Sequence, residues 1–122
     1  MLIVGDGDDA MLDMQPVVDD LRAFREEREW LQFHNPKDLA ISISLEAAEL
    51  LEAFQWSGSD TSGTGREDRI QEELADVMIY CLYLADAMGV DPIKIIEEKV
   101  RINREKYPAA TARGNARKYT EL

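Results

Sequence analysis

The stretch SLEAAELLEAFQW, residues 44–56, places three glutamates at intervals of three residues among side chains that are mostly apolar. At about 100° per residue, Glu46, Glu49 and Glu52 spread over roughly 120° of one helix face, with Glu46 beside the apolar stripe and Glu52 farthest from it. Burial of even one unpaired carboxylate costs several kcal/mol, so such a helix persists only where its charges are solvated or neutralised. By itself, an E-x-x-E spacing on a helix indicates a solvated face.

A second acidic pair changes that interpretation. In EELADVMIYCLYLA, residues 72–85, Glu73 and Asp76 are three residues apart, and no charged residue occurs from 77 to 84. A helix that is apolar nearly all round is a central helix. With an acidic pair on each of two apolar helices, two interpretations are about equally supported. The carboxylates form a solvated face, or they form a site where a divalent cation offsets their mutual repulsion. Oxygen-only ligands favour Mg²⁺ or Mn²⁺ over zinc or copper.

Composition limits the classes of partner and cofactor. The formal net charge of −11 argues against a surface that binds nucleic acid or an anionic membrane. No apolar run reaches the roughly 18 residues that span a bilayer, and the N-terminus lacks the basic region of a signal peptide. The single cysteine, Cys81, cannot form an internal disulfide, so we expect a cytoplasmic protein. Di-iron bundles need two E-x-x-H motifs, and the only histidine, His34, lies outside both acidic pairs.

The hydrophobic spacing predicts an all-α fold, a bundle of four helices. These helices are expected at about 16–32, 36–55, 66–88 and 92–106, from apolar periodicity, from the caps Asn35-Pro36 and Asp91-Pro92, and from the stop at Gly89. Residues 57–65, SGSDTSGTG, indicate a flexible loop. Residues 1–15, which include GDGDD, indicate a flexible acidic tail, which leaves residues 16–122 as one domain.

Several motifs together resemble one known family. E-x-x-E at 46–49 and E-x-x-D at 73–76 are similar to the metal motif of the MazG-like all-α nucleoside triphosphate pyrophosphohydrolases. REWLQFHNP, AFQW, EELADVMIY, INREKYP and ARKYTEL extend the likeness to the dCTP pyrophosphatase branch of that family. The resemblance covers nearly all of residues 17–122. The N-terminal tail, the 57–65 loop and the surface of the first helix depart from the pattern of the family.

The resemblance implies an activity and a metal. The expected reaction is hydrolysis of a (deoxy)nucleoside triphosphate, dCTP or a modified dCTP, to the monophosphate and pyrophosphate, which removes unwanted nucleotides from the pool. Glu46, Glu49, Glu73 and Asp76 would hold Mg²⁺, with Mn²⁺ as a possible substitute. Among these carboxylates, Glu49 is the one we expect to act as general base.

The resemblance also assigns substrate-binding residues. Tyr80 lies one turn beyond Asp76 and within roughly 20° of Glu73 on the helical wheel, so it faces the same side. For any single aromatic residue core packing is the better interpretation, but the matching positions in related enzymes line the base and sugar pocket. Lys99, Asn103 and Tyr107 share one helical stripe, which alone would be a solvated face. The substrate-binding candidates are Trp30, His34, Trp56, Tyr80, Lys99, Asn103, Tyr107, Arg117 and Lys118, with His34 better explained by a structural hydrogen bond.

The size of the chain predicts self-association. A chain of 122 residues covers only part of two helices that are apolar around most of their circumference, so we expect a homodimer or homotetramer. Lys99 or Asn103 could then reach the phosphates of a neighbouring subunit. Two other functions stay open: a dUTP-type pyrophosphatase of the same superfamily, and a non-catalytic acidic helical adaptor.

Overall fold

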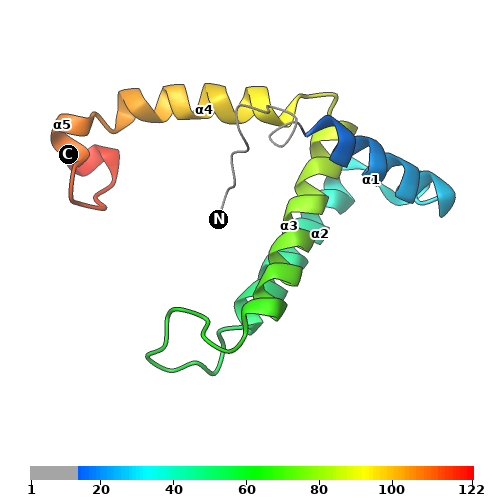
Figure 1. Ribbon diagram of the computed structural model, residues 1–122. Helices are drawn as coiled ribbons and strands as arrows, with labels where there is room; N and C mark the ends of the chain where they lie inside the picture. The colour runs from blue at the N-terminus through cyan, green and yellow to red at the C-terminus, as the bar shows by residue number, and fades with distance from the viewer. Residues whose placement is uncertain (1–13) are drawn as a thin grey trace, which may run out of the picture. The chain divides into compact units, whose positions relative to one another are not determined.

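The computed structural model describes residues 14–122, and every regular element in that part of the chain is helical (Figure 1). The predicted all-α class is therefore confirmed. The acidic tail predicted for residues 1–15 falls largely outside the described residues, and two short 3-10 segments and a one-turn helix accompany four longer helices. The elements are α1 Gln15–Glu27, η2 Leu31–Phe33, α2 Pro36–Glu52, α3 Glu67–Ala87, α4 Pro92–Lys106, α5 Ala109–Ala112 and η3 Tyr119–Glu121.

The helices begin where the sequence places their caps. The Asn35 side chain accepts a hydrogen bond from the Asp38 amide at 2.9 Å, and Pro36 occupies the first turn of α2. The Asp91 carboxylate likewise accepts from the Ile93 amide at 2.9 Å at the start of α4. These bonds satisfy backbone donors that the first turn of a helix leaves without partners, so both starts are fixed locally.

The first helix ends earlier than predicted. It was expected to reach residue 32, but α1 stops at Glu27, and Glu29 adopts a left-handed backbone with φ 54°. The Glu29 amide donates to the Glu26 carbonyl at 3.1 Å, and the Trp30 amide donates to the Arg25 carbonyl at 3.0 Å. This is a Schellman turn in which a glutamate occupies the position usually held by glycine. The turn directs Trp30 back against Phe24, with ring centroids 5.6 Å apart.

The two most apolar helices, α2 and α3, pack along each other (Figure 1). The prediction that α2 would reach Gln55 was wrong: regular α-helix ends at Glu52, and short-range bonds such as Phe54 amide to Leu51 carbonyl, 2.9 Å, take over. In the following loop, the Arg66 guanidinium pairs with Asp60 at 3.3 Å. Gly63, with φ 75°, lies so close to Ile70 that a Cβ would collide with the end of that side chain, and the same Cβ would be only 3.3 Å from the Phe54 ring.

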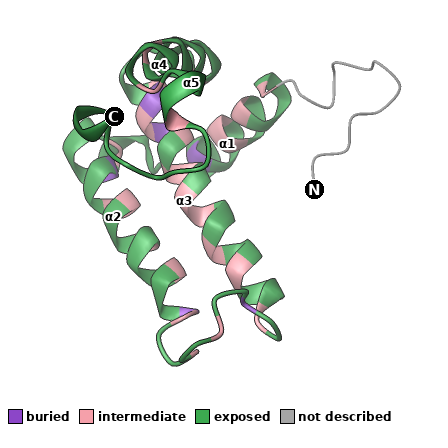
Figure 2. Ribbon diagram, turned by 90° about the vertical axis from the view of Figure 1, so that its left-hand side faces the viewer, coloured by how far each residue is buried: buried purple, intermediate pink, exposed green. Residues whose placement is uncertain are grey.

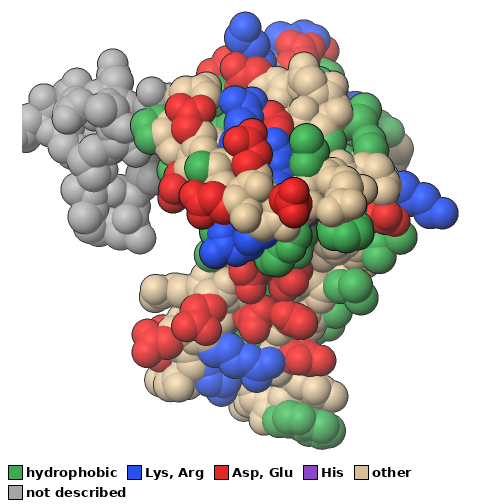
Figure 3. Space-filling view, turned by 90° about the vertical axis from the view of Figure 1, so that its right-hand side faces the viewer, with side chains coloured by type: hydrophobic (Ala, Val, Ile, Leu, Met, Phe, Trp, Pro, Cys, Tyr) green, Lys and Arg blue, Asp and Glu red, His purple; other side chains and the backbone are tan. Residues whose placement is uncertain are grey.

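Few side chains among residues 14–122 are buried (Figure 2). The buried side chains are those of Leu39, Ala53, Tyr83, Ala85 and the charged Arg25, and Gly63 is buried as well. Figure 3 shows acidic and basic side chains interspersed on one face, with hydrophobic side chains exposed between them. Large apolar residues are exposed on α2 and α3, namely Ile41, Leu45, Leu51, Leu74 and Met78.

The described residues form two compact units, the first ending at Met88 and the second running from Gly89 to Leu122. In the second unit, the C-terminal segment beyond the four predicted helices contains α5 and η3. Tyr119 meets the Tyr107 ring edge to face at 6.0 Å, and the Lys106 ammonium lies 4.9 Å from the Tyr119 ring centre. These contacts tie the C-terminus to the end of α4.

Candidate metal and nucleotide site

Carboxylates from α2 and α3 converge on one point. Glu46, Glu49 and Glu73 each offer a carboxylate oxygen, and these oxygens lie within 4.8 Å of one another. Asp76, predicted as a fourth ligand, is not part of this three-residue group, but its charge acts on both Glu46 and Glu73. Helix packing therefore assembles three members of the predicted set and leaves the fourth at its edge.

The cluster is electrostatically strained. The pKa of Glu46 is raised from 4.5 to about 7. Burial is the largest cause, and the neighbouring carboxylates, led by Glu49, add to it. Burial and Glu49 also raise the pKa of Glu73, although the positive charge of Arg69 opposes this. Because ionisation of Glu46 is disfavoured up to neutral pH in the metal-free chain, a cation bound beside it would favour its charged form.

The donor set fits a hard divalent cation. One oxygen of Glu46 and one of Glu73 are shielded from solvent, and neither has a hydrogen-bond partner among the described residues. Unpaired buried oxygens are costly, and Mg²⁺ ligation by carboxylates would remove that cost. Glu52, one turn beyond Glu49, instead pairs with Arg69 at 3.4 Å and is exposed. Of the three glutamates in the 44–56 stretch, Glu52 is therefore the solvated one, and Glu46 and Glu49 are the two that lie close to Glu73 of α3.

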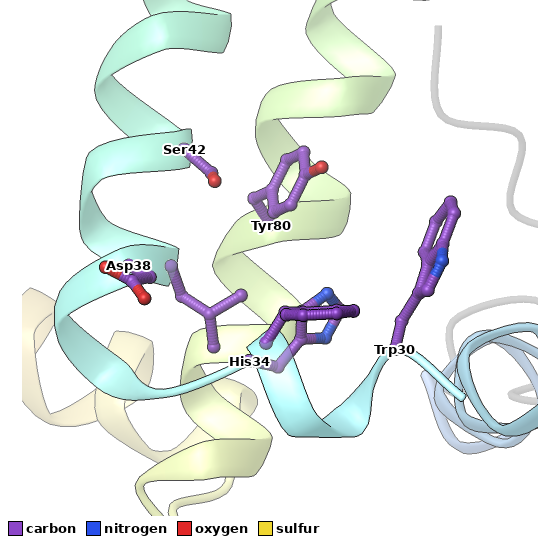
Figure 4. A pocket seen from close by; sticks show the side chains of 7 residues that line it. Trp30, His34, Asp38, Ser42 and Tyr80 are labelled. Atoms are coloured by element: carbon purple, nitrogen blue, oxygen red, sulfur yellow. The ribbon is translucent and has the colours of Figure 1, made fainter. Parts of the chain in front are cut away.

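An aromatic cavity lies beside the carboxylates, in two lobes of about 260 Å³ each that share Trp30, His34 and Tyr80. Figure 4 shows the lobe where Trp30 and His34 from the α1–α2 connection, Asp38 and Ser42 from α2, and Tyr80 from α3 surround one space. Asp76 lines the other lobe, and its charge acts on Glu46 and Glu73, so the cavity lies next to the acidic cluster. The remaining lining residues are Phe33 and Leu39 in the first lobe, and Leu21, Phe24, Ile79 and Tyr83 in the second.

Two polar side chains of the cavity have perturbed acid–base properties. Burial, and then the charges of Glu46 and Asp76, raise the pKa of Tyr80, so its hydroxyl stays protonated. Burial, and then the positive charge of Arg25, lower the pKa of His34, so its ring stays neutral near pH 7. The His34 Nδ1 atom is shielded and has no hydrogen-bond partner among residues 14–122, while the ring packs 4.7 Å from that of Tyr83.

Other predicted substrate residues are not in this cavity. Trp56 follows the end of α2 and is 88% exposed. The remaining candidates belong to the second unit, where Lys99 and Asn103 are exposed one turn apart on α4 and Tyr107 is half-buried against Tyr119. Arg117 and Lys118 precede η3 and are exposed.

Sequence reasoning missed part of the cavity wall. Leu21 and Phe24 have the helical spacing of core residues, and that spacing does not distinguish a core contact from a cavity lining. Tyr83 is three residues beyond Tyr80 on α3, and this i, i+3 relation was the available signal. Arg25 is a charged residue next to Phe24, and nothing in the sequence alone indicates its burial.

Comparison with known proteins agrees with this geometry. The model of the MazG-like family matches residues 41–122, and the chain belongs to that family. Human dCTP pyrophosphatase 1 is 42% identical over 117 residues, which cover 88% of this chain and 69% of the human protein. The rat protein of the same name is 38% identical over the same shares.

A solved structure shares the fold as well. A pyrophosphatase from Archaeoglobus fulgidus DSM 4304 is 44% identical and superposes with a TM-score of 0.71, covering 78% of this chain and 92% of its own. The resemblance inferred from the sequence motifs is therefore confirmed, as is the enzyme class, a nucleoside triphosphate pyrophosphohydrolase. No helix among the described residues is long and apolar enough to cross a bilayer.

Proposed function

We propose that this protein hydrolyses (deoxy)nucleoside triphosphates, with dCTP or a modified dCTP preferred, to the monophosphate and pyrophosphate. The observation that carries the proposal is the convergence of three carboxylates beside an aromatic cavity that Asp76 and Tyr80 also line. A triphosphate and a nucleobase need these two environments next to each other. The similarity to human dCTP pyrophosphatase 1 supports the choice of nucleotide.

Glu46, Glu49, Glu73 and Asp76 would hold Mg²⁺, with Mn²⁺ as a substitute. When bound, the ion would offset the charge on the phosphate oxygens and help to orient or acidify the attacking water. The four side chains supply only oxygen atoms, which agrees with either metal. The shielded oxygens of Glu46 and Glu73 are the best-placed ligands, since no donor among residues 14–122 competes for them.

Glu49 would act as general base. It is the exposed member of the three-carboxylate group, whereas Glu46 and Glu73 are half-buried. Exposure gives Glu49 access to water while its neighbours face the interior. Water would lose a proton to Glu49 and attack the α-phosphorus, and cleavage of the bond between that phosphorus and the bridging oxygen would release pyrophosphate.

The aromatic cavity would hold the nucleobase. Its lobes of about 260 Å³ suit one ring system rather than a whole nucleotide, and the faces of Trp30 and Tyr80 offer stacking surfaces. Asp38, which lines one lobe, is an acceptor when ionised. An acceptor favours the exocyclic amino group of cytosine over the carbonyl of uracil, which supports dCTP over dUTP.

The exposed apolar faces of α2 and α3 support assembly as a homodimer or homotetramer. Large side chains such as Leu45 and Leu51 are 62% and 69% exposed in the single chain. In an assembly, the exposed Trp56 and the α4 residues Lys99 and Asn103 would be available to a neighbour's nucleotide. Tyr107, Arg117 and Lys118 are the remaining phosphate candidates of the second unit.

One experiment tests the reaction and its substrate together. Purified protein with Mg²⁺ is given a panel of natural and modified deoxynucleoside triphosphates in ¹⁸O-water, and the products are analysed by mass spectrometry. We expect the fastest turnover with cytosine nucleotides, the label in the monophosphate, and unlabelled pyrophosphate. Preference for dUTP would favour the alternative pyrophosphatase, and orthophosphate as primary product would contradict attack at the α-phosphorus.

A further inference from the structure

Arg25 is the one buried charged side chain among residues 14–122, with 5% of its surface exposed. It extends from α1 and donates from a terminal nitrogen to an Asp86 carboxylate oxygen on α3 at 3.1 Å. Arg22, one turn earlier, donates to the other oxygen of Asp86, and its Nε does so at 3.0 Å. These bonds, led by those from Arg22, hold the pKa of Asp86 below its ordinary value, so the pair stays ionised near neutral pH.

The Arg25 side chain lies behind the aromatic wall of the cavity. Its guanidinium carbon is 5.5 Å from the centre of the Tyr83 ring, a distance typical of a cation–π contact. The His34 ring is another neighbour of Tyr83, with the two ring centroids 4.7 Å apart. The Tyr83 hydroxyl donates to the Leu21 carbonyl at 2.7 Å, which gives the wall a second attachment to α1.

The backbone of the same residue holds another part of that wall. The Arg25 carbonyl accepts the Trp30 amide at 3.0 Å in the turn that ends α1. Trp30 and His34 are both shared by the two lobes of the cavity. A shift of Arg25 would therefore be transmitted to Tyr83 through its side chain and to Trp30 through its main chain, although Arg25 itself lines neither lobe.

We propose that Arg25 is a positioning residue that sets the geometry of the nucleobase cavity through Asp86, Tyr83 and the Trp30 turn, without contacting the substrate. This inference rests on the proposed function, since it assigns the cavity to the nucleobase. A buried ion pair contributes little to stability over a well-packed apolar alternative, because desolvation offsets much of the attraction. Its geometric effect on the wall is therefore the more informative property to measure.

The experiment compares Arg25→Gln with wild type in the hydrolysis of dCTP. We expect KM for dCTP to rise about tenfold or more while kcat stays within threefold, because misplacement affects base binding rather than the carboxylate cluster. Product inhibition gives a second measurement. Inhibition by deoxycytidine monophosphate, which carries the base, should weaken in parallel, and inhibition by inorganic pyrophosphate should stay within twofold.

Arg22→Gln is the matched control. Arg22 binds the same Asp86 carboxylate, but its side chain is 44% exposed and it lines neither lobe, so KM should stay within twofold of wild type. Arg25→Lys keeps the charge beside Asp86 but loses the planar group next to Tyr83, and we expect an intermediate KM. If Arg25→Gln does not fold, Arg25→Lys serves as the test, and an unchanged KM in it would overturn the proposal.

The results separate this inference from the proposed function. An active wild-type enzyme whose Arg25→Gln variant is folded and has an unchanged KM refutes the positioning role alone. The positioning role is also refuted if deoxycytidine monophosphate and pyrophosphate both inhibit the variant more weakly than wild type, and to the same extent. That pattern indicates a general loss of structure. A wild-type protein that releases no monophosphate from any triphosphate would overturn both.

Discussion

Replacement of Glu46 by glutamine is expected to stabilise the metal-free protein at pH 8 and to weaken its response to Mg²⁺. The ligand oxygens of Glu46, Glu49 and Glu73 lie within 4.8 Å of one another. At that separation two unit charges repel by about 0.9 kcal/mol at the permittivity of water, and physiological salt lowers this to roughly half. Glu46→Gln removes two such repulsions, so the unfolding free energy should rise by about 1 kcal/mol.

The gain should depend on pH in a defined direction. The pKa of Glu46 is about 7 in the folded chain against an ordinary value of 4.5, so the folded state binds more protons between these values. Stability of the metal-free wild type therefore falls as pH rises from about 4.5 to 7. At pH 5 the wild-type carboxyl is already protonated, and the advantage of the variant should disappear.

The assay is urea denaturation at pH 5 and pH 8, at one protomer concentration, with EDTA or with Mg²⁺. Mg²⁺ should stabilise wild type at pH 8, since a ligand that binds only the folded state raises the unfolding free energy, and should stabilise Glu46→Gln much less. The matched control is Glu52→Gln, which removes an exposed glutamate paired with Arg69 and should leave the Mg²⁺ response unchanged. A Glu46→Gln variant that gains as much from Mg²⁺ as wild type, or is less stable than wild type in EDTA at pH 8, would refute the reasoning.

Three further outcomes are expected. Glu29→Gly should raise the unfolding free energy by about 0.5–1 kcal/mol in urea denaturation, because glycine adopts φ 54° without steric cost; a loss of stability would show that the turn is not strained. The pKa of His34 is lowered, so its contribution to stability should be lost as pH falls below about 6.5. The difference in unfolding free energy between wild type and His34→Asn should therefore shrink from pH 7.5 to pH 5.5. A difference that grows over this range would contradict the burial of a neutral ring. Mixing the inactive Glu49→Gln protein with the inactive Lys99→Ala protein should restore some activity if α4 contributes to the site of a neighbouring subunit. No recovery after verified subunit exchange would place Lys99 in its own subunit's site. Light scattering that shows an active monomer would exclude the assembly.

Much of the fold follows from local rules that act within a few residues. Asn35-Pro36 and Asp91-Pro92 fix two helix starts by side-chain capping, and the structure has both. The helix ends were less predictable, because α1 terminates at a left-handed Glu29 where the sequence offers no glycine. That turn is held by backbone bonds and by the contact between Phe24 and Trp30, which a reading of residue types does not reveal.

The candidate site was predictable to the extent that it follows helical periodicity. The i, i+3 spacing placed Glu46 and Glu49 on one face and indicated Glu73 as their partner, and packing of α2 on α3 brings these three together. The supporting residues were not predictable in the same way. The burial of Arg25 depends on Asp86, which is 61 residues away in the chain, and no local pattern links the two.

The connection between α2 and α3 has a consequence for proteolysis. Residues 57–65 are the covalent link between Glu46 and Glu49 on one side and Glu73 and Asp76 on the other, and Gly63 is the point where this loop packs closely on Phe54 and Ile70. A protease that nicks the exposed part of the loop before Gly63 would divide the acidic set evenly between two fragments. We expect a divalent cation to delay the separation of such fragments, so the nicked chain would report metal affinity as a rate of dissociation.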